Sequence, residues 1–229
     1  MKVICSLSLS GGQGKSTVSV LLSKYLAKAG YAVLAVDCDP QSNLTIFLKH
    51  NVEEDEPTLL ELYRKQVNFD DAVYATDFPN LCIIPSDDGL DQVQDYLASS
   101  GIGALSLKKR LEPAAKTFDF VILDSPPQRS QICKSIIGAA DLVLIPAECT
   151  VKGYGSLVRT LDAINELKED GASDADIMGI IPFRDRWVGR TRTNESQMVI
   201  DALTGEVGET QILPSIRESE VFKKAISQG

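Results

Sequence analysis

A lysine and two hydroxyl side chains end a glycine-rich run close to the start of the chain. The run reads Ser8-Leu9-Ser10-Gly11-Gly12-Gln13-Gly14-Lys15-Ser16-Thr17. Glycines allow backbone N–H groups to close around phosphate oxygens, and a helix that begins at such a run adds partial positive charge. Lys15 can then reach β- and γ-phosphates, and the Ser16 hydroxyl can ligate Mg²⁺. The run therefore predicts nucleotide binding.

The run departs from the usual phosphate-loop pattern at one position. Leu9 stands where the common motif has its first glycine, so Gly-x-x-x-x-Gly-Lys-Ser is not met. The alternative is an ordinary glycine turn. An apolar run at residues 3–7 and a helical pattern of apolar residues after Thr17 favour the strand–loop–helix order of a phosphate site.

Two aspartates could add metal or water chemistry to this site. Asp39 follows the apolar run 33–36, and Asp124 ends the run 118–124. The carboxyl ends of parallel strands meet at one edge of a sheet, so both should lie near the phosphate loop. Asp39 could hold Mg²⁺ through water or orient an attacking water, and Asp124 is the expected Walker B acid. For both, the alternative is an aspartate of a turn or a helix cap.

Apolar and amphipathic segments alternate along the chain. We expect strands at 3–7, 33–36, 81–85, 118–124, 141–146, 176–182 and 210–213, and helices at 18–26, 58–67, 70–74, 92–98, 105–111, 156–168, 195–203 and 218–227. This alternation predicts an α/β fold: a single doubly wound, mainly parallel sheet with helices on both faces. Because no proline- or glycine-rich linker interrupts it, we expect one domain over residues 1–229.

Composition narrows the class of protein further. The net charge is −9, which argues against a generally basic nucleic-acid binder but leaves room for a local basic cluster. The apolar runs are too short for a membrane span, and the N-terminus leaves no room for a signal peptide. The five cysteines lack C-x-x-C spacing and suggest reduced residues, most of them in the core, of a cytoplasmic protein.

Four segments together resemble the ParA/MinD family of Walker-box ATPases. They are Ser10–Thr17, Asp37-Cys38-Asp39-Pro40-Gln41-Ser42-Asn43, Val121-Ile122-Leu123-Asp124-Ser125-Pro126-Pro127 and Leu144-Ile145-Pro146, and a tail around Pro214 and Arg217 adds to them. The resemblance implies an ATPase that forms a homodimer with two ATP molecules between the subunits. It also implies nucleotide contacts from residues 10–17 and Pro214, a water positioned by Asp39, and Mg²⁺ held by Ser16, Asp39 and Asp124, partly through water.

One residue departs from the family. The usual lysine that reaches the partner's phosphates is replaced by Ser10, as in the McdA-type branch that positions carboxysomes. Another cation should then offset the facing triphosphates. Our candidate is Lys152, which follows a predicted strand and should lie near the same edge of the sheet; the alternative is an ordinary surface lysine. Arg129 and Arg186 are further candidates.

The resemblance further implies non-specific binding to nucleoid DNA as an ATP dimer, and hydrolysis stimulated by an McdB- or ParB-like adaptor that links the ATPase to its cargo. The expected DNA residues form basic clusters, although scattered solvated charges would explain them too: Arg184, Arg186, Arg190, Arg192, Arg217, Lys223 and Lys224. Three alternative functions remain open: plasmid or chromosome partition, a MinD-like membrane ATPase, and a metabolic ATP-dependent enzyme of the same fold. We expect no membrane binding, since the C-terminal segment has few large apolar residues.

Overall fold

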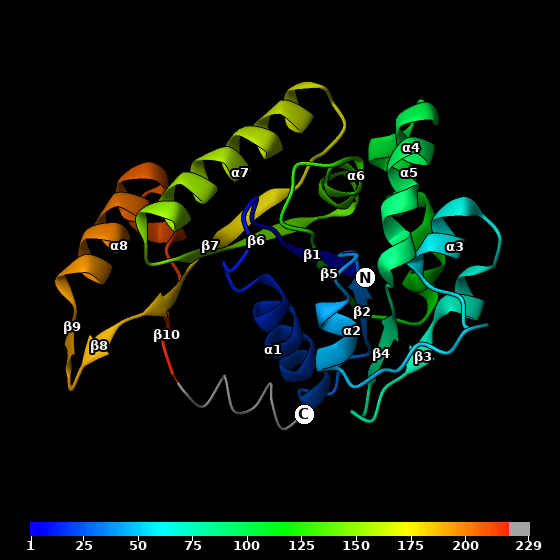
Figure 1. Cartoon of the computed structure of the whole chain (residues 1–229), viewed down its shortest axis with the longest axis horizontal. Helices are drawn as coiled ribbons and strands as arrows, with labels where there is room; N and C mark the ends of the chain where they lie inside the picture. Colours follow the sequence, from blue (N-terminus) through cyan, green and yellow to red (C-terminus); the bar gives the residue numbers. More distant parts are fainter. Residues whose placement is uncertain (220–229) are drawn as a thin grey trace.

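The structure, a computed structural model, describes residues 1–219. An eight-stranded sheet has the order β10-β7-β6-β1-β5-β2-β4-β3, and all its pairs are parallel except β3–β4 (Figure 1). Its strands are β1 (Lys2–Ser6), β2 (Val33–Asp37), β3 (Tyr74–Ala75), β4 (Leu81–Ile84), β5 (Phe120–Asp124), β6 (Leu142–Glu148), β7 (Asp176–Asp185) and β10 (Ile216–Arg217). The predicted α/β class with a mainly parallel sheet is confirmed.

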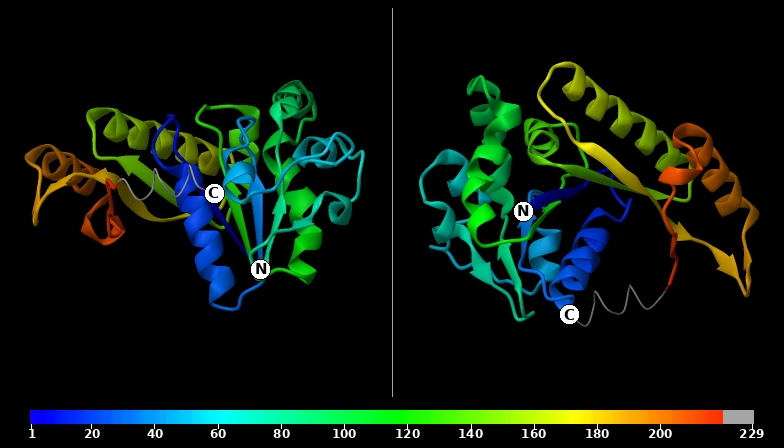
Figure 2. Two further views of the ribbon diagram at one scale, coloured as in Figure 1. Left: turned by 60° about the horizontal axis from the view of Figure 1, so that its bottom comes forward. Right: turned by 180° about the vertical axis from the view of Figure 1, so that it is seen from behind.

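Helices cover both faces of the sheet (Figure 2). They are α1 (Lys15–Lys28), α2 (Asn43–Phe47), α3 (Leu59–Arg64), α4 (Val93–Ser99), α5 (Gly103–Leu111), α6 (Gln131–Ala139), α7 (Val151–Glu169) and α8 (Asn194–Val207). Short 3₁₀ helices are η1 (Phe69–Ala72), η2 (Asp88–Gln92), η3 (Glu112–Lys116) and η4 (Glu209–Gln211), and a separate hairpin joins β8 (Trp187–Val188) to β9 (Thr191–Arg192).

Two apolar clusters hold these layers together. Along β2, Leu34 and Val36 belong to one cluster, whereas Val33 and Ala35 belong to the other. This is the period of two that a strand imposes, and a strand buried on both faces reads as a continuous apolar run. The first cluster joins the sheet to α3–α8, and the second joins it to α1 and α2. Both sides of the central strands are therefore core.

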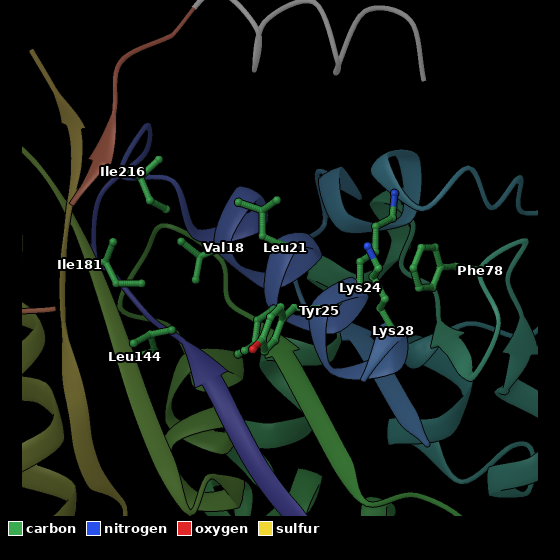
Figure 3. A pocket seen from close by; sticks show the side chains of 10 residues that line it. Val18, Leu21, Lys24, Tyr25, Lys28, Phe78, Leu144, Ile181 and Ile216 are labelled. Atoms are coloured by element: carbon green, nitrogen blue, oxygen red, sulfur yellow. The ribbon is translucent and has the colours of Figure 1, made fainter. Parts of the chain in front are cut away.

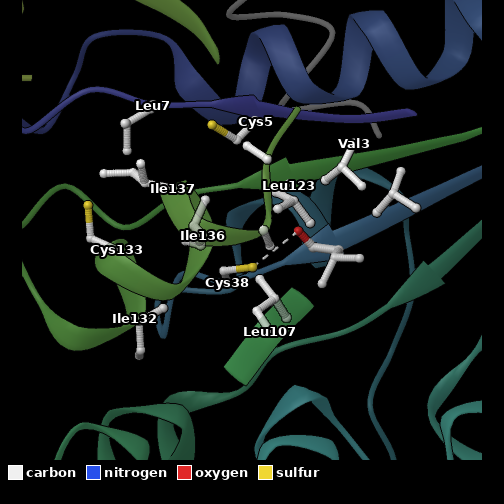
Figure 4. Packing of buried hydrophobic residues seen from close by; sticks show 14 of the residues in the cluster. Val3, Cys5, Leu7, Cys38, Leu107, Leu123, Ile132, Cys133, Ile136 and Ile137 are labelled. Atoms are coloured by element: carbon white, nitrogen blue, oxygen red, sulfur yellow. Dashed lines mark hydrogen bonds between the residues drawn. The ribbon is translucent and has the colours of Figure 1, made fainter. Parts of the chain in front are cut away.

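Four of the five cysteines behave as core residues. Cys5, Cys38 and Cys133 pack among leucine and isoleucine side chains of the first cluster (Figure 4). Burial raises the pKa of the Cys133 thiol to about 11, so it stays protonated. Cys149 is also buried, Cys82 is half-buried, and all five are free thiols, as expected from the sequence.

Several predicted elements were wrong. The helix expected at 156–168 begins earlier, at Val151, because the Thr150 side chain caps it by accepting from the Gly153 N–H. The strand expected at 210–213 is instead η4 followed by one bridge between Ile212 and Ile180. The segment 70–74 is divided between η1 and the antiparallel strand β3. Most of the predicted helix 218–227 lies outside the described residues.

Candidate nucleotide-binding site

The glycine-rich run forms the loop between β1 and α1. Gly12 and Gly14 have φ values of 83° and 95°, the left-handed region that favours glycine. A Cβ on Gly14 would also lie 2.6 Å from the Phe183 ring. Gly14 is the N-cap of α1 and provides no side-chain cap, so the N–H groups of the first turn keep their capacity to bind an anion.

This loop borders a pocket of about 390 Å³. The lining residues come from the loop, from the segments after β2 and β5, and from the end of β7: Gly11, Gly12, Gly14, Lys15, Ser16, Thr17, Asp39, Gln41, Asn43, Phe47, Pro127, Phe183 and Arg184. The structure thus brings together the loop and Asp39, which the sequence places near one sheet edge.

Lys15 is buried at the base of the pocket and its ammonium donates to the Ser10 carbonyl at 3.1 Å. Burial lowers the pKa of Lys15, whereas the nearby carboxylates Asp124 and Asp39 raise it. Lys152 lowers the pKa as well, which means that a second cation stands close to the loop. A cation held by a single described hydrogen-bond acceptor retains donors for phosphate oxygens.

Asp124 ends β5, is fully buried and is not among the residues that line the pocket, although its charge acts on Lys15. Its Oδ1 accepts from the Ser19 hydroxyl at 2.9 Å, whereas its Oδ2 has no hydrogen-bond partner among the described residues. Burial raises the pKa of Asp124 to about 7, the charge of Asp37 adds to this rise, and the hydrogen bond from Ser19 together with the nearby Ser16 hydroxyl opposes it. A buried carboxylate oxygen without a partner fits a site for Mg²⁺ or its water.

The two acids after β2 have different surroundings. Asp37 faces Asp124 across the β2–β5 pair and accepts from both the N–H and the hydroxyl of Thr45, at 2.8 Å each. Its pKa rises to about 6 because it is buried. Asp39 lines the pocket, accepts from the Gln41 N–H at 3.0 Å, and has a pKa raised by burial. Asp37 is therefore bound within the protein, and Asp39 faces the pocket.

Lys152 lies in the first turn of α7, and its ammonium donates to the Gly11 carbonyl at 3.1 Å. The next residue must be glycine, because a Cβ on Gly153 would lie 1.9 Å from the Glu148 carbonyl oxygen. This close approach sets the helix start against the end of β6. The structure places Lys152 at the phosphate loop, where the sequence hypothesis needs it.

The sequence did not associate Arg184 or Phe183 with this pocket. Arg184 has a φ of 53° and directs its guanidinium to Glu148 at 2.9 Å. The Glu148 N–H in turn donates to the Gln13 side chain at 2.8 Å. Arg184, expected on a DNA surface, therefore lies at the edge of the pocket and is connected to the phosphate loop. Only the tertiary approach of β7 to the loop reveals this.

The remaining basic residues of the 184–192 stretch are largely ion-paired. Arg186 pairs with Glu195 and Glu218, and Arg192 pairs with the buried Asp185. Arg217 stacks 3.8 Å from the Trp187 ring centroid. Arg190 stands in the turn of the β8–β9 hairpin, and it has no ion pair within residues 1–219. The candidates Lys223 and Lys224 lie outside the described residues.

Two further candidates lie apart from the pocket. Pro214 is exposed and is not among the lining residues. Arg129, a fallback for the cross-subunit cation, forms an ion pair with Glu166 of α7.

A second pocket, of about 560 Å³, borders the other side of α1 and contains none of the predicted nucleotide residues (Figure 3). It is lined mainly by apolar side chains of α1, β6, β7 and β10, among them Val18, Leu144, Ile181 and Ile216. Among the described residues, no helix has the length and apolar character needed to cross a membrane.

Comparisons with known proteins find relatives that match this chain over most or all of its length. A family model described as an AAA domain matches residues 1–174. The maintenance of carboxysome distribution protein A of Synechococcus elongatus is 48% identical over 229 residues, which are 100% of this chain and 90% of that protein. The sporulation initiation inhibitor protein Soj of Bacillus subtilis is 29% identical over 180 residues, which cover 79% of this chain and 71% of Soj.

The fold is also similar to that of a solved structure. The ATP complex of an aspartate-to-alanine variant of Cyanothece McdA superposes with a TM-score of 0.97 at 50% identity, covering 100% of this chain and 87% of that chain. The chain therefore belongs to the AAA-domain family and, within it, to the ParA/MinD-type Walker-box ATPases that include the McdA proteins.

Proposed function

We propose that this ATPase binds MgATP in the glycine-loop pocket, forms an ATP-sandwich homodimer, binds nucleoid DNA non-specifically and positions carboxysomes through adaptor-stimulated hydrolysis. The observation that carries the nucleotide part is the convergence of the loop, Lys15 and Asp39 on one pocket. The carboxysome part rests on the likeness to the Synechococcus protein over the whole chain. Residues 1–229 would act as one domain, in the cytoplasm on the nucleoid.

The residues present fit a magnesium ion. The Ser16 hydroxyl and, through water, Asp124 and Asp39 would hold Mg²⁺ together with the phosphates, since Mg²⁺ takes few protein ligands and keeps several waters. The unpartnered Oδ2 of Asp124 supports this assignment. When bound, the ion would neutralise phosphate charge and polarise the transferred group.

The protein residues would share the catalytic work among themselves. Residues 10–17 bind the phosphates through backbone N–H groups, and Lys15 adds a positive charge where negative charge develops. Asp39 orients the attacking water from its place in the pocket. Pro214 remains a proposed contact of the nucleotide.

Lys152 would provide the cation that Ser10 lacks. It reaches the phosphate loop from the start of α7, and it is exposed. A lysine at a helix N-terminus is unfavourable with respect to the helix dipole, so a binding role would explain its presence. In the dimer, its ammonium would contact the partner's phosphates.

The DNA surface would use the cations around the β8–β9 hairpin together with the C-terminal lysines: Arg184, Arg186, Arg190, Arg192, Arg217, Lys223 and Lys224. A cluster can bind phosphates despite a net charge of −9, because binding depends on local potential. Arg190 and Arg217 are the members whose guanidinium groups are free of carboxylate partners within residues 1–219.

One experiment tests these steps together. Retention on non-specific DNA is measured with ATP, ADP and no nucleotide across a salt series, with and without a candidate adaptor protein. We expect retention with ATP only, with a steep loss of affinity as salt rises, because counterions are released on binding. Retention that ignores nucleotide, or none at low salt, would refute the DNA part. Retention on liposomes instead of DNA would favour a membrane ATPase.

A further inference from the structure

One face of α7 forms hydrogen bonds with the first half of the phosphate loop. Four side chains, at positions 152, 156, 159 and 160 of the helix, make these contacts. The bonds are Lys152 Nζ to Gly11 O at 3.1 Å, Ser156 Oγ to Ser8 Oγ at 2.9 Å, Arg159 Nη2 to Ser10 Oγ at 3.0 Å, and Leu9 N to Thr160 Oγ1 at 3.1 Å.

The Arg159 contact differs from the others because Ser10 carries a second bond. The Ser10 hydroxyl accepts from Arg159, while the Ser10 carbonyl accepts from the Lys15 ammonium. The three residues form a continuous chain from an exposed arginine to the buried lysine at the base of the pocket. Ser10 and Arg159 are 149 residues apart in the sequence.

The Arg159 side chain runs back along α7 to reach Ser10. A Cβ on Gly155 would lie 3.4 Å from the Arg159 guanidinium nitrogen Nη1, so the guanidinium lies directly over this glycine. Gly155 lies one turn before Arg159, where long helical side chains point. The guanidinium therefore lies back along α7 over Gly155, towards Ser10.

We propose that Arg159 is a positioning residue for nucleotide binding. Its hydrogen bond to the Ser10 hydroxyl holds the phosphate loop in place, together with the Ser10 carbonyl that accepts from Lys15. This rests on the proposed use of the pocket for MgATP, but requires neither a dimer nor DNA. Ser10 then has a role of its own, because its hydroxyl is the attachment point of the loop. A loop held in the binding shape lowers the cost of ordering it around phosphates.

The test is a double-mutant cycle on nucleotide affinity. Arg159→Ala, Ser10→Ala and the double variant are compared by titration with a fluorescent ATP analogue and Mg²⁺, and by steady-state kinetics. We expect each single variant to raise both the Kd for the ATP analogue and the KM for ATP by about 5- to 10-fold, with kcat little changed. The reason is that a lost charged hydrogen bond in the loop weakens binding of the ground state and of the transition state alike. The double variant should be no weaker than either single variant.

Controls separate this role from charge and from folding. Ser10→Ala keeps the arginine, so an effect of bulk positive charge alone would leave its Kd at the wild-type value. Lys168→Ala removes a cation from the same helix, at a position where the Lys168 ammonium pairs with Asp176 Oδ1 at 3.9 Å, and this variant should bind nucleotide as the wild type does. Arg159→Lys should recover part of the affinity, and the midpoint of thermal unfolding should be unchanged in Arg159→Ala.

Two results would overturn the inference while leaving the proposed function intact: wild-type affinity in Arg159→Ala, or losses in the two single variants that multiply in the double variant. A wild-type protein that binds no ATP would refute the proposed function, and the inference with it.

Discussion

The two lysines at the phosphate loop and the arginines Arg186 and Arg192 at the β8–β9 hairpin are held in opposite ways. At the pocket, Lys15 and Lys152 donate to backbone carbonyls of the phosphate loop, and within residues 1–219 neither forms a direct ion pair. At the hairpin, Arg186 and Arg192 pair with carboxylates. The lysines at the phosphate loop can therefore bind an anion directly, whereas much of the positive charge at the hairpin is already neutralised by carboxylates of the same protein.

Asp185 explains the second arrangement. Its buried carboxylate accepts from Trp187 Nε1 at 2.8 Å, Arg192 Nε at 3.0 Å and Ser215 Oγ at 2.6 Å, and these bonds keep its pKa below the usual value. Arg192 and Arg217 also stack on the Trp187 ring. A count of four arginines in nine residues thus overstates the charge available to DNA.

The largest expected effect is at the pocket. Asp39→Ala should reduce ATP hydrolysis by about 100-fold or more, because the group that orients water is lost, while ATP binding persists. Turnover and ATP-dependent dimer mass are measured together, and the variant should accumulate as an ATP-bound dimer. Wild-type turnover would remove Asp39 from the catalytic role. Asp55→Ala, at an exposed acid outside the pocket, serves as the control.

Lys152→Ala should abolish ATP-dependent dimerisation while nucleotide binding by the monomer is spared. The reason is that two facing triphosphates would lose the cation between them. Light scattering with MgATP measures the mass, and Lys168→Ala is the matched control on the same helix. A dimer of unchanged mass and affinity would show that Lys152 is an ordinary surface lysine.

Asp185→Asn should lower the free energy of unfolding by about 2–3 kcal/mol, because several donors lose a charged acceptor in a buried position. Urea unfolding measures the change. The control Asp174→Asn alters an exposed acid and should be neutral. A neutral Asp185→Asn would mean that the hairpin does not depend on this carboxylate.

The contributions of the two regions to the free energy of unfolding should depend differently on pH. Asp124 and Asp37 have pKa values raised to about 7 and about 6, so between pH 4 and 7 the folded protein binds more protons than the unfolded chain, and stability falls as pH rises. Asp185 has a lowered pKa, so its contribution stays constant above pH 4 and is lost only in acid. The midpoint of thermal unfolding is measured without nucleotide from pH 5 to 8. Asp124→Asn should make this midpoint depend less on pH, whereas Asp185→Asn should lower the midpoint by a similar amount at every pH. If the midpoints of the wild type, Asp124→Asn and Asp185→Asn all changed with pH in the same way, this difference would be contradicted.

The smallest effect is expected at the tip of the hairpin. Arg190→Ala should weaken ATP-dependent DNA retention a few-fold and reduce the salt slope by about one, the value for one phosphate contact. Lys109→Ala, at an exposed position on α5, is the control. An unchanged slope would remove the hairpin tip from the DNA surface.

Local and regular features were predictable from the sequence. The phosphate loop is contiguous, so its glycines, lysine and serine carry their spacing into the structure unchanged. Asp39 and Asp124 could be placed near it because parallel strands carry their C-terminal residues to one edge of the sheet. The start of α7 was mispredicted because Gly153 and Gly155 look unfavourable for a helix, although close packing against Glu148 requires a glycine at residue 153.

By itself, the sequence determined the fold class, the phosphate loop and the identity of the acids at the strand ends, because each depends on neighbouring residues or on a repeated pattern. Only the tertiary structure decided which cations are free and which are paired, that Arg184 lies at the pocket, and that Arg159 reaches Ser10. These contacts join residues far apart in the chain, and the pairing of a charge depends on what the fold places within a few ångströms of it.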